Sequence, residues 1–221
     1  MRRRWRPALF VVLLAVSGFL AYLAAGSDPF AWDRPVAEWT VGISVSGFRG
    51  AMEAVSIPGT TLGVLLSLAV ATAAVLAWRG WRAASVVAAV ILANALNVGL
   101  KAVVGRPRPG GLGEFNSFPS GHVVHTVVFL GVLWALIAPR LPPGAPRIAL
   151  GAVMGTAVVL VGVSRIHLER HWPSDVLGGY VVGALALWAL LWVARGFLGR
   201  PNADATQEGE RHARRAEDEG R

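Results

Sequence analysis

The chain has no cysteine, and charged residues make up only 15% of its 221 residues. Without thiols, the protein can form neither a disulfide framework nor a thiolate metal site. A soluble domain needs about 25% charged residues to cover its surface, whereas 54% of the residues here are hydrophobic. The composition therefore excludes an ordinary soluble domain and indicates a single membrane-embedded domain.

Lysine is almost absent as well. Lys101 is the one lysine among 21 basic residues, and all the others are arginine. The formal net charge of +8 would suit a nucleic-acid-binding protein. The arginines, however, stand at the ends of apolar segments and form no continuous basic stripe. We therefore expect no nucleic-acid partner, and we expect Lys101 to have a role other than solubility.

Long apolar runs dominate what is present. A helix needs about 20 apolar residues to cross a bilayer, and six segments reach or approach this length: 8–25, 60–78, 83–104, 122–138, 148–164 and 174–198. The predicted fold is an all-α, polytopic membrane protein, a bundle of six transmembrane helices within residues 1–198. Residues 199–221 are polar and mixed in charge, so we expect a disordered cytoplasmic tail there.

The arginines also predict an orientation in the cell inner (plasma) membrane. Ten of them lie at alternate segment ends, which the positive-inside rule places in the cytoplasm: Arg2, Arg3, Arg4, Arg6, Arg79, Arg82, Arg140, Arg147, Arg195 and Arg200. Both termini are then cytoplasmic, and the loop 26–59 is external. Residues 1–25 also resemble a cleavable signal peptide. With either interpretation, the chain from residue 26 onward emerges on the outer side.

Three separated clusters combine cations, histidines and a carboxylate at the predicted outer face. They are Lys101 to Arg108-Pro109, then Pro119-Ser120-Gly121-His122, and finally Ser164-Arg165 followed by His171 and Asp175. Cations neutralise phosphate oxygens, and a histidine held by an acid can attack phosphorus. If the clusters converge, they form a site that handles phosphate esters.

The sequence around each cluster fits such a site. Ser120 is a good helix N-cap, and Gly121 lets the helix backbone approach an anion closely. Asp175 follows Pro173 in the first turn of a helix, where it can accept the N–H of His171 and leave the other ring nitrogen as nucleophile. Each cluster alone also has a structural explanation: snorkelling basic side chains, a capped helix, or an interfacial His–Asp pair.

Together the clusters resemble the signatures of the type 2 phosphatidic acid phosphatase (PAP2) family. These signatures are a lysine separated by six residues from Arg-Pro, then Pro-Ser-Gly-His, then Ser-Arg followed by a spaced His and Asp. The resemblance covers residues 60–198. It implies that His171 is the nucleophile that forms a phosphohistidine, that Asp175 orients it, and that His122 protonates the leaving alcohol and then activates water. It also implies the groups that hold the phosphate oxygens: Lys101, Arg108, Ser120, Gly121 and Arg165.

The sequence favours a metal-independent phosphatase without a cofactor. A two-metal site needs several bridging carboxylates, and only Glu114, Glu169 and Asp175 lie around the clusters. We expect a lipid phosphate as substrate, with a polyprenyl diphosphate such as undecaprenyl diphosphate as the first choice, because the site faces outward. Phosphatidate, phosphatidylglycerophosphate, transfer of phosphate to another hydroxyl, and non-enzymatic lipid-phosphate binding or transport remain alternatives.

We predict different roles for the other polar residues near the clusters. His125 follows His122 by one helical turn, and we expect it to form hydrogen bonds inside the bundle. His167 is predicted to be a loop residue. Arg106 and Arg170 either widen the positive field at the mouth of the site or are solvated surface arginines.

Overall fold

The computed structural model describes residues 5–26, 28–109 and 116–198, so the predicted tail from residue 199 lies outside the described residues. Within these ranges the chain is helical and contains no strand. The long helices are α1 (Trp5–Ala25), α4 (Thr61–Arg79), α7 (Gly121–Ile137), α8 (Ala145–His167) and α9 (Pro173–Leu198), and α5 (Trp81–Ala88) continues into α6 (Val90–Val104).

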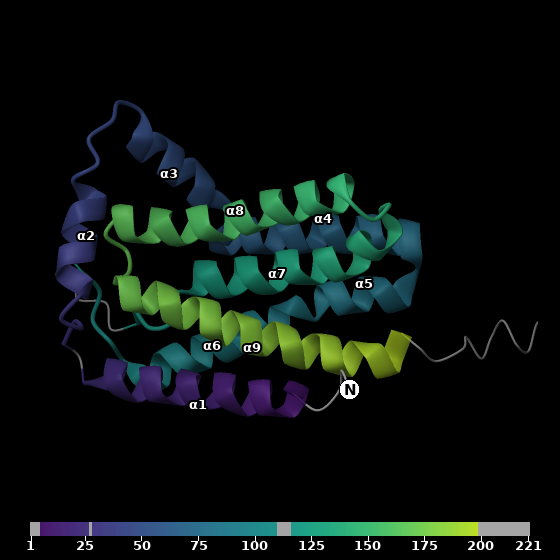
Figure 1. Cartoon of the computed structure of the whole chain (residues 1–221), viewed down its shortest axis with the longest axis horizontal. Helices are drawn as coiled ribbons and strands as arrows, with labels where there is room; N and C mark the ends of the chain where they lie inside the picture. The colour runs from purple at the N-terminus through teal and green to yellow at the C-terminus, as the bar shows by residue number, and fades with distance from the viewer. Residues whose placement is uncertain (1–4, 27, 110–115, 199–221) are drawn as a thin grey trace, which may run out of the picture.

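The six predicted membrane-spanning segments are confirmed. Helices that are long and apolar enough to cross a membrane cover residues 8–25, 61–79, 81–104, 121–140, 145–167 and 173–198. They lie side by side in one bundle (Figure 1). The apolar runs form helices because a helix satisfies all of its own backbone hydrogen bonds within the bilayer. The protein is thus a six-helix transmembrane bundle.

One end of the bundle gathers the segments that carry the three clusters. Helix α2 (Asp33–Val41) lies across this end, where α1, α6 and α8 finish and α4, α7 and α9 begin (Figure 1). Two of the turns there have clear local causes. Gly105 ends α6 in the left-handed conformation at φ 62°, and the Thr60 side chain caps α4 by accepting from the N–H of Gly63 at 3.1 Å.

The segment 26–59, which we expected only as an external loop, contains two short helices. Helix α2 packs against α8 and α9, while α3 (Phe48–Ser56) packs along α8 and is followed by the 3₁₀ turn η1 (Ile57–Gly59). The prediction for His167 was wrong, because it is a buried residue in the last turn of α8. Its Nδ1 lies 2.9 Å from the carbonyl oxygen of Thr40, and its ring meets Phe48 edge-on. These contacts join α2 and α3 to α8.

Helices α7 and α9 approach each other closely through glycine. A Cβ atom at Gly179 would lie 2.9 Å from Cβ of Val123, and one at Gly183 would lie 2.9 Å from Cβ of Val127. Small residues allow membrane helices to pack at such short range. The backbone N–H of Ser120 then donates to the carbonyl oxygen of Asp175 at 3.0 Å. The start of α7 is therefore fixed against the first turn of α9.

A buried polar contact joins α6 to α7 deeper in the bundle. His125 is 1% exposed, and its Nδ1 lies 3.2 Å from Nδ2 of Asn94. Polar groups at membrane depth are costly without partners. The expectation that His125 forms hydrogen bonds within the bundle is confirmed.

Candidate active site

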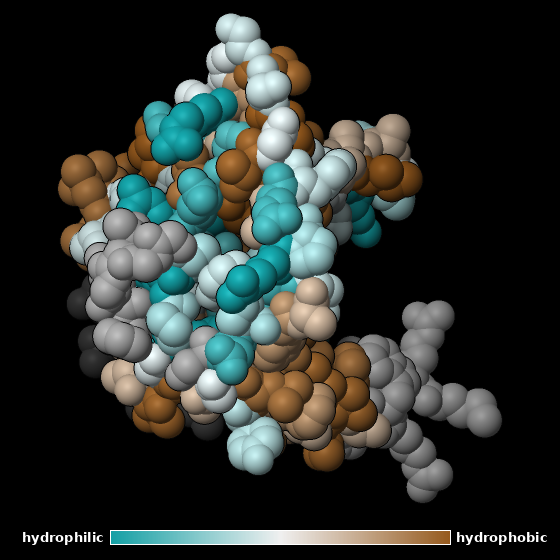
Figure 2. Space-filling view, turned by 90° about the vertical axis from the view of Figure 1, so that its left-hand side faces the viewer, coloured by the Kyte–Doolittle hydropathy of each residue, from teal (hydrophilic) through white to brown (hydrophobic). Residues whose placement is uncertain are grey.

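A single cavity brings the three clusters together at the end of the bundle. Its volume is about 480 Å³, and its polar lining includes Lys101, Arg108, Gly121, His122, Arg165 and His171. Figure 2 shows this end of the molecule, where hydrophilic residues gather in the middle and apolar residues lie mostly around the rim. The cavity continues between α4 and α6, where it is lined by Thr61, Val64, Leu65, Ile91, Asn94, Asn97 and Val98.

Asn116 anchors the two cations of the first cluster. Its carbonyl oxygen accepts a hydrogen bond from Nζ of Lys101 at 2.6 Å. Its side-chain Oδ1 accepts from Nε and Nη2 of Arg108 at 3.0 and 2.9 Å. A lysine at a helix end and an arginine in a loop are thereby held toward one cavity. Asn116 was not predicted as a site residue, and the signal available was a polar residue shortly before the second cluster.

Arg165 supplies a third cation from the last turn of α8. The residue is 7% exposed, and its Nη1 donates to Oγ of Ser56 at 3.1 Å. Oγ of Ser164 lies 2.8 Å from the same Ser56 oxygen, so the serine of the third cluster supports Arg165 from behind. Within the described part of the chain, Nε of Arg165 is buried without a hydrogen-bond partner. That N–H is available to an anion in the cavity.

The start of α7 contributes two more polar groups without partners. Nε2 of His122 and Oγ of Ser120 are both buried, and neither has a hydrogen-bond partner among the described residues. A buried polar atom without a partner is costly unless a ligand completes its bonding. The first backbone N–H groups of a helix also carry partial positive charge. The beginning of α7 therefore suits a bound anion.

His171 lies in the connection between α8 and α9 and is 3% exposed. Its Nδ1 faces Asp175, but the distance to Oδ2 is 3.7 Å, which is longer than a hydrogen bond. The direct bond expected from the sequence is not formed, because Oδ2 of Asp175 accepts from Oγ of Ser117 and from the N–H of Trp172. With Nδ1 turned toward Asp175, Nε2 is the ring nitrogen on the opposite side.

Burial sets the protonation state of His171. Loss of hydration lowers the pKa of this imidazole from its ordinary 6.5 to about 4, with the nearby cations Lys101 and Arg165 acting in the same direction and Asp175 opposing them. The ring is consequently neutral at pH 7. A neutral ring has a free lone pair, which a nucleophile requires.

Arg106 differs most from its predicted place. The expectations put it at the mouth of the site or on the solvated surface, yet its side chain is completely buried. It forms ion pairs with Asp33 at 2.9 Å and with Asp175 at 2.6 Å. Burial without such partners would be prohibitive for a guanidinium. Asp33 was not predicted as a site residue, because no local pattern in the sequence distinguishes it from the nearby acid Glu38.

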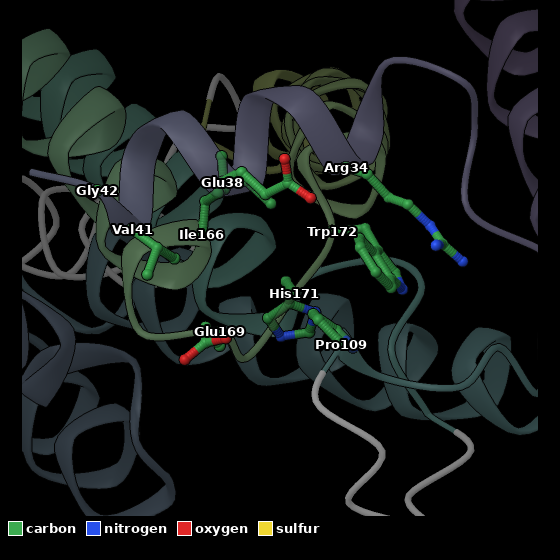
Figure 3. A pocket seen from close by; sticks show the side chains of 10 residues that line it. Arg34, Glu38, Val41, Gly42, Pro109, Ile166, Glu169, His171 and Trp172 are labelled. Atoms are coloured by element: carbon green, nitrogen blue, oxygen red, sulfur yellow. The ribbon is translucent and has the colours of Figure 1, made fainter.

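A second cavity, also of about 480 Å³, lies beneath α2 and shares His171 with the first. Figure 3 shows Arg34 and Glu38 on the α2 side of this cavity, with Glu169 and Trp172 around His171. Its lining mixes carboxylates with a cation, and carboxylates repel phosphate. The first cavity, with three cations, is therefore the better phosphate site.

Comparison with known proteins gives relatives that are named as phosphatases. The chain is 28% identical over 200 residues to lipid A 1-phosphatase of Rhizobium etli, covering 81% of both chains. It is 35% identical over 83 residues to the putative undecaprenyl-diphosphatase YbjG of Escherichia coli K12, covering 37% of each. Those two similarities concern sequence alone.

The fold is also shared with a solved structure. A transmembrane PAP2 type phosphatidylglycerolphosphate phosphatase from Bacillus subtilis superimposes with a TM-score of 0.71 at 24% identity, covering 90% of this chain and 98% of that one. The model of the PAP2 superfamily matches residues 82–197, which is more than half of the chain and includes all three clusters. The chain belongs to the PAP2 superfamily.

Proposed function

We propose that this protein is a membrane lipid phosphatase that works through a phosphohistidine on His171. The observation that carries the proposal is the cavity in which Lys101, Arg108 and Arg165 converge beside a buried, neutral histidine. Three fixed cations can stabilise the negative charge that develops on a transferring phosphoryl group. We assign this activity to residues 1–198.

The first chemical step forms the phosphoenzyme. The lone pair on Nε2 of His171 attacks phosphorus, and an N–P bond forms while the P–O bond to the lipid breaks. The leaving oxygen keeps the electron pair of that bond and receives a proton from His122. For a diphosphate substrate the leaving group is the lipid monophosphate. Asp175, on the Nδ1 side, stabilises the positive charge that the ring gains.

The second step releases phosphate. A water molecule gives one proton to His122 and attacks phosphorus, and the N–P bond breaks with its electron pair returning to Nε2 of His171. The enzyme then regains its starting state. If a lipid or sugar hydroxyl replaces water in this step, the same centre acts as a phosphotransferase.

The shape of the cavity supports a lipid as the substrate. Leu65 of α4 and Ile91 and Val98 of α6 line it, and their side chains are 53%, 42% and 66% exposed on the flank of the bundle. In a bilayer this flank contacts acyl chains. A lipid tail can then extend between α4 and α6 while its phosphate reaches the cations.

We take a polyprenyl diphosphate as the first candidate substrate. The arginine pattern supports a site on the extracytoplasmic side of the plasma membrane, with both termini in the cytoplasm. A carrier lipid released on that side presents its diphosphate there, and a relative bears the name undecaprenyl-diphosphatase. Lipid A 1-phosphate is the second candidate, because the relative named for that reaction aligns over 81% of both chains.

Phosphate release by the purified protein tests both parts of the proposal. The panel should contain undecaprenyl diphosphate, lipid A 1-phosphate, phosphatidylglycerophosphate and phosphatidate in matched detergent micelles. We expect turnover of at least one lipid, with undecaprenyl diphosphate the fastest. Loss of lipid phosphate without free phosphate would identify a phosphotransferase. Tight binding of every lipid without any turnover would contradict the proposed enzyme.

A further inference from the structure

We propose that Asp33 and Arg106 are positioning residues for Asp175, so that helix α2 supplies part of the catalytic centre. This inference rests on the proposed function, because Asp175 is the group that would orient the nucleophile. Asp33 lies outside residues 82–197, the part of the chain that matches the family model. It reaches the centre only because α2 lies across the end of the bundle (Figure 1).

The guanidinium of Arg106 bridges two carboxylates. Its Nη1 donates to Oδ1 of Asp175 at 2.6 Å and to Oγ of Ser174 at 2.7 Å. Its Nη2 donates to Oδ2 of Asp33 at 2.9 Å and to the carbonyl oxygen of Asp28 at 3.3 Å. A planar fork with several donors can hold all these acceptors at once, which a single ammonium group cannot do as well. Arg106 therefore fixes where Asp175 lies relative to α2.

Asp33 completes the arrangement at the start of α9. Its Oδ1 accepts the backbone N–H of Ser174 at 2.8 Å, and its Oδ2 accepts the Ser174 hydroxyl at 2.6 Å. The first N–H groups of a helix have no partner within that helix. Asp33 thus caps α9 from another helix and holds the residue directly before Asp175.

The carboxylate of Asp175 has little freedom to rotate as a result. Arg106 holds one oxygen, while Ser117 and the N–H of Trp172 hold the other, which faces Nδ1 of His171. Asp33, Arg106 and Asp175 are all completely buried. One cation between two carboxylates leaves a net negative charge on the Nδ1 side of His171. That charge stabilises the positive ring formed when Nε2 bonds to phosphorus.

A purely structural network would have a different signature. Removing one member of a buried ion pair strongly destabilises a protein, but the molecules that still fold would then react normally. A positioning network instead changes the rate of the chemical step in folded protein. The Asp33 oxygens accept hydrogen bonds from Phe30, Arg106 and Ser174, all outside the phosphate-binding set, so phosphate binding should be preserved.

Asp33→Asn is the central variant, because asparagine keeps the shape and one acceptor oxygen while it removes the charge. The assay uses the panel lipid that the wild type hydrolyses fastest, with inorganic phosphate as competitive inhibitor. We expect kcat to fall about 10- to 100-fold, less than the roughly 10²- to 10³-fold for loss of a group that contacts the transition state, because Asp33 acts through Asp175. KM and the inhibition constant of phosphate should stay within about 3-fold, as expected when only transition-state interactions are lost.

Asp28→Asn is the matched control. Asp28 is exposed and contacts Arg106 only through its backbone oxygen, so this variant removes a nearby carboxylate and leaves the network intact. It should behave as the wild type does. Arg106→Lys should retain more activity than Arg106→Gln, because the lysine keeps the charge. If the Arg106 variants do not fold, Ser174→Ala provides the second test, since it removes the hydroxyl shared by Asp33 and Arg106.

Two results would overturn the inference while leaving the proposed function intact. One is a wild-type kcat per folded Asp33→Asn molecule. The other is a parallel rise in KM and in the phosphate inhibition constant, which would indicate a general collapse of the cavity. Failure of the proposed function has a separate signature, because the wild type itself would then hydrolyse no lipid in the panel.

Discussion

At the scale of single residues, the candidate site is a set of buried polar atoms whose bonding is incomplete. Nε2 of His122, Oγ of Ser120 and Nε of Arg165 have no hydrogen-bond partner within the described part of the chain. An anion with several oxygens can satisfy groups that approach from different helices. The same desolvation that makes these groups costly strengthens their attraction for phosphate.

Replacing the nucleophile should lower activity more than replacing any one of the cations. We expect His171→Ala to lower kcat on the order of 10⁵-fold or more and to abolish the phosphoenzyme, because no other group can form the N–P bond. Arg165→Lys should retain a weak activity, since the charge survives without the planar fork. Rapid-quench trapping of labelled phosphoenzyme checks both variants. Near-normal turnover by His171→Ala would rule out the mechanism.

The pH dependence follows from the lowered pKa of His171. The imidazole attacks only when it is neutral, so the rate of phosphoenzyme formation should be constant above the pKa and fall as the pH drops through about 4. An unburied histidine would lose its reactivity already near its ordinary 6.5. Single-turnover rates with p-nitrophenyl phosphate, whose leaving group needs no proton, isolate this step. A midpoint near the ordinary value would contradict the buried, neutral nucleophile.

Charge stabilisation by fixed cations predicts that chelators have little effect. Lys101, Arg108 and Arg165 supply the positive charge, and across residues 5–26, 28–109 and 116–198 no three histidine or acidic side chains form a metal-ligand set. Activity should persist in excess EDTA, and vanadate should inhibit because it can adopt the five-coordinate geometry of phosphorus under attack. Loss of activity in EDTA that magnesium restores would show that a metal provides the charge.

At the scale of elements, the turn before α4 controls the position of His122. A Cβ atom at Gly59 in η1 would overlap the His122 side chain, lying 2.8 Å from its Cβ. We expect Gly59→Ala to push the imidazole from its place and to lower kcat about 10- to 100-fold, less than the roughly 10²- to 10⁴-fold that a general acid contributes, because the group is displaced and not removed. Gly99→Ala on α6 is the control, because no heavy atom lies within 4 Å of its added Cβ.

The measurement for Gly59→Ala should compare two kinds of leaving group. The alcohol released from phosphatidate needs a proton from His122, whereas p-nitrophenolate does not, so the defect should be larger with phosphatidate. An equal loss with both substrates would show that the turn affects the whole cavity rather than His122. A normal rate with the lipid would show that the turn can shift without moving the histidine.

The elements also show how far the sequence could predict the fold. The six spans were predictable because each consists of apolar residues over the length of a bilayer, a signal that depends on no other part of the chain. Helices α2 and α3 were not predicted. They are short, and packing against α8 stabilises them more than their own residues do.

The residues of the candidate site also fall into those that the sequence could predict and those that it could not. Lys101, His122 and His171 could be found from spacing within short clusters, because their residue types are rare in this chain. Asp33 and Arg106 could not, since they are distant in the sequence and the ion pair exists only after α2 lies across α9. Neither charge has a local pattern that distinguishes it from a solvated surface residue.

At the scale of the whole molecule, the orientation in the membrane decides which lipids can reach the site. The arginine pattern predicts that both termini are cytoplasmic, so a reporter fused after Arg221 should behave as cytoplasmic, and one inserted at Gly111 should behave as external. Paired alkaline phosphatase and green fluorescent protein fusions measure both positions. A cytoplasmic signal from Gly111 would place the cavity on the inner face and would exclude the carrier-lipid candidate.

The opening of the cavity between α4 and α6 has a kinetic consequence. A substrate that enters along the flank of the bundle never passes through bulk water, so the enzyme encounters it by diffusion in two dimensions. The relevant substrate concentration is then the mole fraction of the lipid in the bilayer or micelle. Adding inert detergent at a constant amount of substrate should slow the reaction by surface dilution, although the molar concentration in the tube is unchanged.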